Sequence, residues 1–162
     1  MRGLRRERRP DLPVAAGERL LAWGTTPDGD VVGGTRDALY LPRRVPWEQV
    51  EAADWDRDTA VLRLSEVGSW GAARPEHLYD VAEPGRLVQL IRERVTASVV
   101  YQRHVLLDGR RGLRVIARRA PGGAGSLTWI YEYDEGVDPD DPLVRLAAGQ
   151  ALSAARDEVG LD

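Results

Sequence analysis

The stretch Leu127-Thr128-Trp129-Ile130-Tyr131-Glu132-Tyr133-Asp134 has the clearest alternating pattern in this chain of 162 residues. Its odd-numbered positions are apolar or aromatic, and three of its four even-numbered positions are polar. Because successive side chains of a strand point to opposite faces of a sheet, this pattern predicts a strand with one buried face. The expected fold of the second half of the chain is built around this strand.

Three further elements are predicted beside it. The runs 99–107 and 113–119 favour two strands joined by a glycine-bearing hairpin loop. Asp141 is a good N-cap for a helix from Pro142 to about Val159, and Gly160 is a suitable stop. We expect the helix to cover the apolar face of a three-stranded antiparallel sheet. That face is predicted to consist of Val99, Tyr101, Val105, Leu107, Leu113, Val115, Ala117, Leu127, Trp129 and Tyr131.

The opposite face of this sheet is predicted to be polar and basic. Residues 92–119 carry eight arginines and two acids, whereas residues 120–162 carry two arginines and nine acids. Arginine binds carboxylate and phosphate groups in a bidentate manner, so the cluster is the best candidate binding surface. The opposite face would carry Gln102, His104, Arg114, Arg118, Thr128 and Glu132, and the arginine cluster comprises residues 103, 110, 111, 114, 118 and 119. The candidate binding residues are His104, Arg103, Arg110, Arg111, Arg114, Arg118 and Glu132.

The first half is predicted to consist of short strands separated by turns and followed by a helix. Leu87, Leu90, Ile91 and Val95 recur at helical spacing in a segment expected to run from Pro84 to about Ser98. The strands are expected at 19–23, 31–35, 38–41, 50–55, 59–65 and 77–81, with a loop at 42–46 and an irregular stretch between Gly68 and Gly71. The predicted fold class is therefore α+β and mostly antiparallel β.

This order of strands closed by one helix resembles a bacterial pleckstrin-homology-like domain, and the whole arrangement is similar to that of actinobacterial proteins, which implies no activity. Three stretches carry the resemblance: Gly17 to Trp23, Gly34 to Leu41 and Val45 to Val50. It implies a strand barrel or sandwich capped by the helix. The expected organisation is a flexible basic arm at 1–12, a pleckstrin-homology-like domain at 13–98, and a β-β-β-α extension at 99–162.

The resemblance also implies phosphoinositide binding by basic residues of the first hairpin loop, and here the sequence departs from the family. Residues 25–30 contain Asp28 and Asp30 and no basic residue. Aspartates repel phosphate groups, so phosphoinositide binding is not expected. The family is also a common scaffold for protein contacts, and a fold does not determine a function.

The residue types that are missing exclude several chemistries. All 23 basic residues are arginine, and the chain has no lysine, cysteine, phenylalanine or asparagine. A P-loop or Schiff-base lysine is excluded, as are thiolate chemistry, disulfides and cysteine-held metals. The codon bias behind this composition indicates a GC-rich bacterial genome.

The remaining candidates for catalysis or metal binding are weak, and we expect neither an enzyme nor a cofactor. His77 and His104 have no partner in the sequence, and an active site would need a concave pocket around His104 with Glu132 within hydrogen-bond reach. The acids of Asp54 to Asp58 are spaced as in a calcium loop, but positions six and twelve are Thr59 and Ser65 instead of glycine and glutamate.

Three interpretations of the arginine cluster stay open. It is a solvated face paired internally with residues 132–141, a docking surface for an acidic protein partner, or, together with the arm, a nucleic-acid surface. We expect a non-catalytic interaction module that binds an acidic protein, with nucleic-acid binding as the alternative. The basic start lacks an apolar region, and no apolar run approaches the roughly 20 residues of a membrane span, so a cytoplasmic location is expected.

Overall fold

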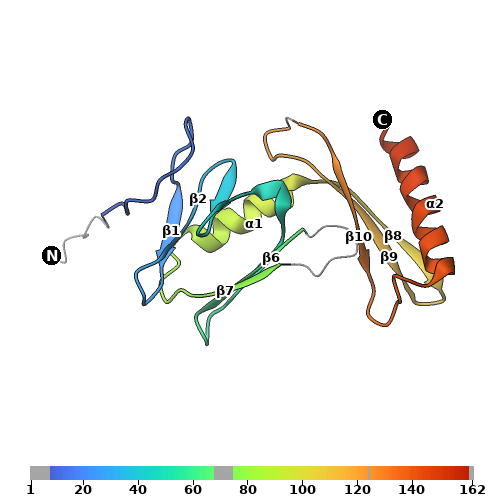
Figure 1. Ribbon diagram of the computed structural model, residues 1–162, viewed down its shortest axis with the longest axis horizontal. Helices are drawn as coiled ribbons and strands as arrows, with labels where there is room; N and C mark the ends of the chain where they lie inside the picture. Colours follow the sequence, from blue (N-terminus) through green and yellow to red (C-terminus); the bar gives the residue numbers. More distant parts are fainter. Residues whose placement is uncertain (1–7, 68–74, 124, 161–162) are drawn as a thin grey trace.

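The computed structural model describes residues 8–67, 75–123 and 125–160. Over these residues the chain is α+β, with three antiparallel sheets and two α-helices, and the sheets do not close into a barrel (Figure 1). The predicted fold class is confirmed. The elements are β1 (Ala22–Thr25), β2 (Val31–Gly34), β3 (Ala38–Tyr40), β4 (Arg44–Pro46), a 3-10 turn η1 (Trp47–Gln49), β5 (Val50–Asp56), β6 (Val61–Glu66), β7 (Glu76–Asp80), α1 (Leu87–Ser98), β8 (Val99–Asp108), β9 (Arg111–Arg118), β10 (Thr128–Tyr133) and α2 (Pro142–Val159).

The first half is a sandwich of two sheets with α1 packed against it. One sheet has the order β1-β2-β3-β4 and the other the order β5-β6-β7. Both sheets and α1 contribute to a single buried core, because the inward positions of each strand are apolar. The core contains Ala22, Val32, Leu39, Leu41, Val45, Trp47, Val50, Leu62, Leu64, Val81, Leu87 and Ile91.

Trp47 is the largest fully buried side chain of this core. Its indole N–H donates to the carbonyl oxygen of Thr35 at 3.0 Å, so the polar atom of the ring is satisfied. Gly34 makes room for the ring, since a Cβ there would lie 2.7 Å from Leu90 and 3.2 Å from Trp47. The glycine in the stretch Gly34 to Leu41 thus lets η1 and α1 approach β2 closely.

A buried carboxylate fastens the segment before β1 to the first sheet. Glu18 accepts hydrogen bonds from the hydroxyl of Thr35 at 2.6 Å, from Tyr40 at 3.0 Å and from Nε of Arg44 at 2.9 Å. Burial raises the pKa of Glu18, but these donors outweigh that effect and hold it below its ordinary value. These bonds therefore connect the stretch Gly17 to Trp23 with the stretch Gly34 to Leu41.

The second half is a three-stranded sheet of order β10-β9-β8, covered on one face by α2 (Figure 1). The predicted apolar face is confirmed for six of its ten residues: Leu113 and Val115 are buried against Ala148 and Ala155 of α2, with Tyr101, Leu107, Trp129 and Tyr131 packed around them. The prediction for Val99 is wrong, because a register shift between Val99 and Tyr101 places Val99 opposite Arg118. The helix has its predicted bounds. Asp141 caps it by accepting from the backbone N–H of Leu143 at 2.8 Å.

Three local predictions in the first half are wrong. The strand expected at 19–23 begins three residues later, as β1 at Ala22–Thr25. The expected loop at 42–46 contains β4, a strand of only three residues that pairs with β3 and ends at Pro46. The expected helix start at Pro84 is displaced to Leu87, because Gly85 adopts a φ of +53°, which is outside the right-handed helical region. The end of this helix at Ser98 is confirmed.

Some predictions fall on residues outside the described ranges, namely residues 1–7 of the arm and the irregular stretch between Gly68 and Gly71.

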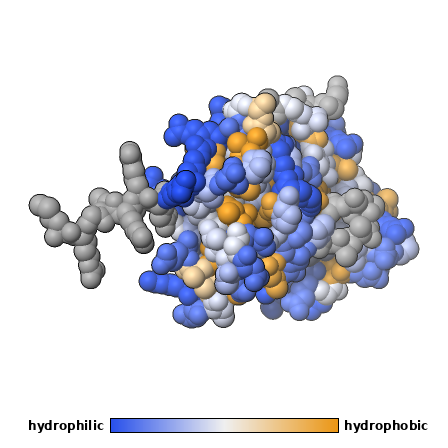
Figure 2. Space-filling model, turned by 60° about the vertical axis from the view of Figure 1, so that its left-hand side comes forward, coloured by the Kyte–Doolittle hydropathy of each residue, from blue (hydrophilic) through white to orange (hydrophobic). Residues whose placement is uncertain are grey.

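Across the described part of the chain, no helix has the length and apolar character that crossing a membrane requires. On the face shown in Figure 2, apolar groups form separate areas among hydrophilic side chains.

Candidate functional site

The strand register brings four chemistry-bearing side chains together on the face of the second-half sheet that is turned away from α2. His104 of β8 lies opposite Arg114 of β9, and Arg114 lies opposite Glu132 of β10. Asp134 follows β10 directly, and its backbone N–H donates to the carbonyl oxygen of Gly112 at 3.0 Å. We call His104, Arg114, Glu132 and Asp134 the polar strip.

Within the polar strip, His104 bonds to Asp134 and not to Glu132. Nε2 of His104 lies 2.9 Å from Oδ2 of Asp134, which also accepts from the backbone N–H of Gly112 at 2.8 Å. These two hydrogen bonds, with that from His104 first, hold the pKa of the Asp134 carboxyl below its ordinary value. Gly112 is required here, since a Cβ would overlap the carbonyl oxygen of Val105.

The guanidinium group of Arg114 makes only a loose ion pair with its neighbour Glu132. Its Nη1 lies 3.9 Å from Oε1 of Glu132, a separation that is too long for a hydrogen bond, and both side chains are 44% exposed. An ion pair of this kind contributes little to stability in water. The guanidinium group of Arg114 can therefore exchange Glu132 for a better-placed carboxylate.

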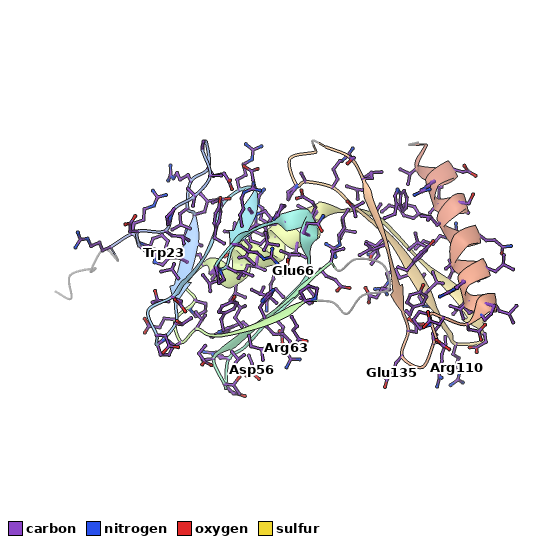
Figure 3. All side chains as sticks on the ribbon, viewed as in Figure 1. Trp23, Asp56, Arg63, Glu66, Arg110 and Glu135 are labelled. Atoms are coloured by element: carbon purple, nitrogen blue, oxygen red, sulfur yellow. The ribbon has the colours of Figure 1, made fainter. Side chains whose placement is uncertain are left out.

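Two more arginines lie at the adjoining hairpin between β8 and β9. Arg110 and Arg111 are exposed, and neither makes an ion pair with the residues that the structure describes. Figure 3 places Arg110 and Glu135 at the same end of the second half. We call Arg110, Arg111, Arg114 and His104 the basic tip, because these four basic side chains lie at or beside this hairpin and are exposed or half-exposed.

The expectation that Arg118 presents its charge to a partner is wrong. The residue is 4% exposed and lies between the two halves of the molecule. Its Nη1 donates to the carbonyl oxygen of Val50 at 3.2 Å and to the hydroxyl of Ser98 at 3.0 Å, and its Nη2 donates to the carbonyl oxygen of Glu51 at 3.0 Å. Burial lowers the pKa of Arg118. Arg118 joins β9 to β5 and to the end of α1.

Arg103 does not lie on the same face of the sheet as His104 and Arg114. It lies across from Val115, on the side of the sheet that α2 covers, and its Nη1 is 3.3 Å from Oε2 of Glu158 in that helix. The same carboxylate oxygen accepts from the hydroxyl of Tyr101 at 2.8 Å. The predicted binding residues are thus distributed over two faces and one interior position.

Sequence reasoning missed a second charged cluster, at the edge of the sandwich core. Glu66 is buried and accepts from Nη2 of Arg43 at 2.5 Å, and Nε2 of His77 lies 2.6 Å from its Oε2 (Glu66 is labelled in Figure 3). The ring of His77 stacks on Tyr79, with centroids 6.4 Å apart. Glu66 continues the inward alternation of Leu62 and Leu64, which signals that this carboxylate needs buried partners, but nothing in the sequence identifies Arg43.

This cluster gives a pH-dependent prediction. Burial raises the pKa of Glu66, but Arg43 and His77 together lower it by more than burial raises it. The pKa of Glu66 therefore lies below its ordinary value of 4.5. Stability from this carboxylate is therefore complete above about pH 4.5 and is lost as the pH falls through the lower folded-state pKa. We expect Glu66→Gln to reduce the free energy of unfolding at pH 7 by about 1 kcal/mol. The effect is modest because Arg43 is largely exposed, so water screens its interaction with Glu66.

Urea unfolding at pH 7 and at progressively lower pH tests this prediction, with the exposed Glu76→Gln as the control. The difference between wild type and Glu66→Gln should narrow towards acid pH. A difference that stays constant across the range, or a control that behaves in the same way, would contradict the assignment.

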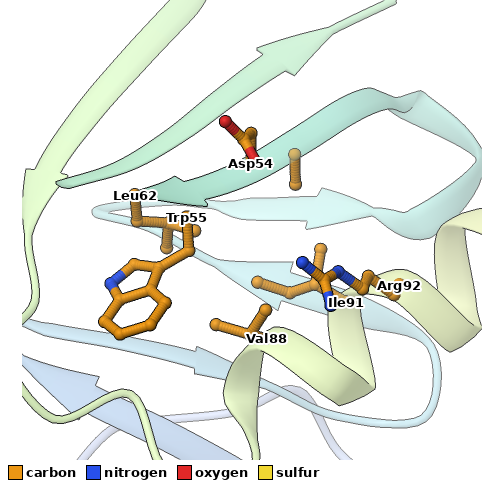
Figure 4. Close-up of a pocket in the computed structure, with 7 residues that line it drawn as sticks. Asp54, Trp55, Leu62, Val88, Ile91 and Arg92 are labelled. Carbon is orange, nitrogen blue, oxygen red and sulfur yellow. The ribbon is translucent and has the colours of Figure 1, made fainter. Parts of the chain in front are cut away.

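A shallow depression lies elsewhere, between β5 and α1. It is lined by Trp55, Leu62, Val88 and Ile91, with Asp54 and Arg92 at its rim (Figure 4). Asp54 and Asp56 lie in β5, and Asp58 lies in the turn that follows, where Asp56 accepts from the backbone N–H groups of Asp58 and Thr59. Among the described residues, no group of three or more histidine, aspartate or glutamate side chains is arranged to hold a metal ion.

In comparisons with known proteins, no family model, no curated protein and no solved structure matches this chain.

Proposed function

We propose that this protein is a non-catalytic interaction module, in which the first half is a pleckstrin-homology-like scaffold and the basic tip docks an acidic segment of a partner protein. The arrangement of a four-stranded sheet, a three-stranded sheet and a closing helix supports the scaffold. Its location in the cytoplasm and an actinobacterial origin stay predictions.

The observation that carries the proposal is the pairing state of the arginines. Arg118 is buried and Arg103 has an exposed ion pair with Glu158, whereas Arg110 and Arg111 are exposed without an ion pair to any described residue and Arg114 has a loose one. Guanidinium groups that lack a carboxylate partner are available for bidentate contacts with one. Glu132 and Asp134 beside them repel a polyphosphate, which concentrates its negative charge, more strongly than singly charged carboxylates.

Lipid headgroups are a poor fit to the scaffold itself. The hairpin between β1 and β2 presents Asp28 and Asp30, both exposed. A phosphorylated headgroup would be repelled at this loop.

The proposal predicts salt-sensitive binding of an acidic peptide. A short fluorescein-labelled polyglutamate peptide, titrated with the full chain and followed by anisotropy, should bind at low salt and weaken as the salt approaches about 0.15 M. Arg110→Glu with Arg111→Glu should weaken binding at least about tenfold. The charge-matched control, Arg57→Glu with Arg86→Glu, should have a much smaller effect, because those exposed arginines lie in the first half.

Equal weakening by both double variants would show that the peptide responds to net charge alone and would overturn the proposal. A gel-shift series on mixed DNA and RNA separates the alternative. If the protein does not bind the acidic peptide but retards nucleic acid with an affinity that falls steeply with salt, the surface is a nucleic-acid interface.

A further inference from the structure

The strand β8 forms one edge of the second-half sheet and is the longest strand in the described part of the chain. It pairs with β9 on one side only, because the sheet has the order β10-β9-β8 (Figure 1). Every second residue of an antiparallel edge strand points its backbone N–H and C=O groups away from the sheet. Among the described residues, no strand lies beside the outer edge of β8 to accept or donate these hydrogen bonds.

The features that protect many free sheet edges are missing from the middle of β8. The register with β9 shifts only between Val99 and Tyr101 and between Leu106 and Asp108, so the stretch from Tyr101 to Leu106 is regular. This stretch contains no proline. Leu106 is 58% exposed and lies opposite Gly112, which has no side chain to cover it. A long edge without a bulge and with an exposed leucine is a template for the addition of another strand.

The other free edges of the described sheets fit an acidic strand less well. β10 contains Glu132 and no basic residue, and β7 begins with Glu76 and ends with Asp80. β5 contains three acids and no basic residue. β1 and β4 have only four and three residues. An acidic segment would be repelled at the first three of these edges and would find few hydrogen-bonding groups at the last two.

The turn at the end of β8 supplies charge complementarity for an acidic segment. The β8–β9 hairpin, residues 99–118, carries five arginines and one acid, Asp108. Arg110 and Arg111 are exposed at the turn and make no ion pair with a described residue. Farther along the strand, Leu106 and Val100 are exposed apolar residues. A segment that lies along β8 would therefore place its carboxylates near the turn and its apolar side chains beside Leu106.

The charges of β8 disfavour a second copy of this chain as the added strand. The regular stretch of β8 is centred on Arg103 and His104. A symmetric antiparallel pair about this centre would place Arg103 opposite Arg103 of the other copy, or the two His104 rings opposite each other. Like charges directly opposite each other are destabilising in a sheet. We therefore expect the added strand to come from a different protein.

We propose that the acidic partner binds as an extra strand along the free edge of β8, with its carboxylates at Arg110 and Arg111 and an apolar side chain beside Leu106. This inference rests on the function proposed above and specifies how the partner binds. Main-chain hydrogen bonds to β8 supply affinity, and the basic tip determines which end of the segment lies at the turn. The partner segment is extended, has no proline opposite residues 101–106, and is acidic at one end.

Amide hydrogen exchange of the isotope-labelled full chain, followed residue by residue by NMR, tests strand addition. The probe is a short peptide with two glutamates at one end, followed by alternating valine and threonine. Bound probe should slow the exchange of alternate amides between Tyr101 and Leu106 at least about tenfold. The intervening amides, which face β9, should not change.

A second peptide of equal charge and length is the matched control for the probe. Two adjacent prolines replace one central valine and one central threonine, so that one proline faces β8 in either register and removes a donor. This peptide should bind at least about tenfold more weakly than the probe. On the protein, Leu106→Ser should weaken binding of the probe about threefold through the loss of an apolar contact. Leu78→Ser, at a leucine of β7 that is 60% exposed, should have no effect.

The possible results separate this inference from the function on which it rests. If both peptides bind equally well and Arg110→Glu with Arg111→Glu weakens both, without protection of β8, strand addition is wrong and docking at the basic tip stands. If neither these peptides nor polyglutamate binds at low salt, both proposals are wrong. Protection of β8 in the free chain, with a sedimentation mass above the 17.9 kDa of the monomer, would assign the edge to a second copy and overturn the inference.

Discussion

Replacing Arg118 by alanine is expected to lower the free energy of unfolding by about 3 kcal/mol. The substitution removes three hydrogen bonds and leaves the carbonyl oxygens of Val50 and Glu51 without that donor at a buried junction. It also leaves a cavity between the two halves, since the side chain is 4% exposed. Arg114→Ala, which alters a half-exposed arginine of the same strand, should cost less than about 1 kcal/mol.

Urea unfolding followed by circular dichroism measures both changes. Arg118→Met separates packing from hydrogen bonding, because methionine refills much of the cavity but satisfies neither carbonyl oxygen. We expect its loss to lie between that of wild type and that of the alanine variant. If Arg118→Ala cost no more than Arg114→Ala, the two halves would not depend on this residue.

Arg118→Met also distinguishes a docking face that includes Arg118 from a basic tip that does not. If all the predicted arginines formed one docking face, Arg118→Met would weaken binding of the acidic peptide. Because the structure places Arg118 inside the molecule, Arg118→Met should leave that affinity unchanged in the fraction that is folded. Binding and stability therefore respond to different arginines of the cluster.

Replacing Trp47 by alanine is expected to have the largest effect on stability, a loss of about 4 kcal/mol. The ring is completely buried in the core of the first half and lies beside Gly34 of β2, and its indole N–H satisfies the carbonyl oxygen of Thr35. Trp47→Phe keeps most of the apolar contact but removes the donor, so it should cost about 1 to 2 kcal/mol.

Trp23→Ala is the matched control for Trp47→Ala. Trp23 is only partly buried in β1, so removal of its ring should cost clearly less. Equal losses at the two positions, measured by urea unfolding, would contradict the central place of Trp47 in the core.

The elements that could be predicted from the sequence are those with local signals. The bounds of α2 follow from Asp141, Pro142 and Gly160, whose preferences act within one helical turn. The buried face of the second sheet follows from the alternation around Trp129, which holds because α2 covers that face. The short strand β4 has no such signal, and the start of α1 depends on the backbone conformation of Gly85.

The candidate site could be predicted only in part, because alternation assigns a side chain to a face and does not show what covers that face. Arg114 and Arg118 lie on one face, yet β5 and the end of α1 cover only Arg118. The bond between His104 and Asp134 depends on a glycine at position 112 that allows the strands to approach. Contacts such as Arg43 with Glu66 form between separate sheets, and a one-dimensional pattern does not contain them.

The proposed docking of an acidic partner at the basic tip requires a bound peptide to lie there, and the position of the peptide can be measured. Amide chemical shifts of the isotope-labelled chain, recorded during titration with the polyglutamate peptide, report that position residue by residue. We predict that the largest shifts cluster at residues 104 and 110–114, with little change around Arg118. Shifts spread evenly over exposed arginines, or centred on α1 or the first hairpin, would contradict the claim.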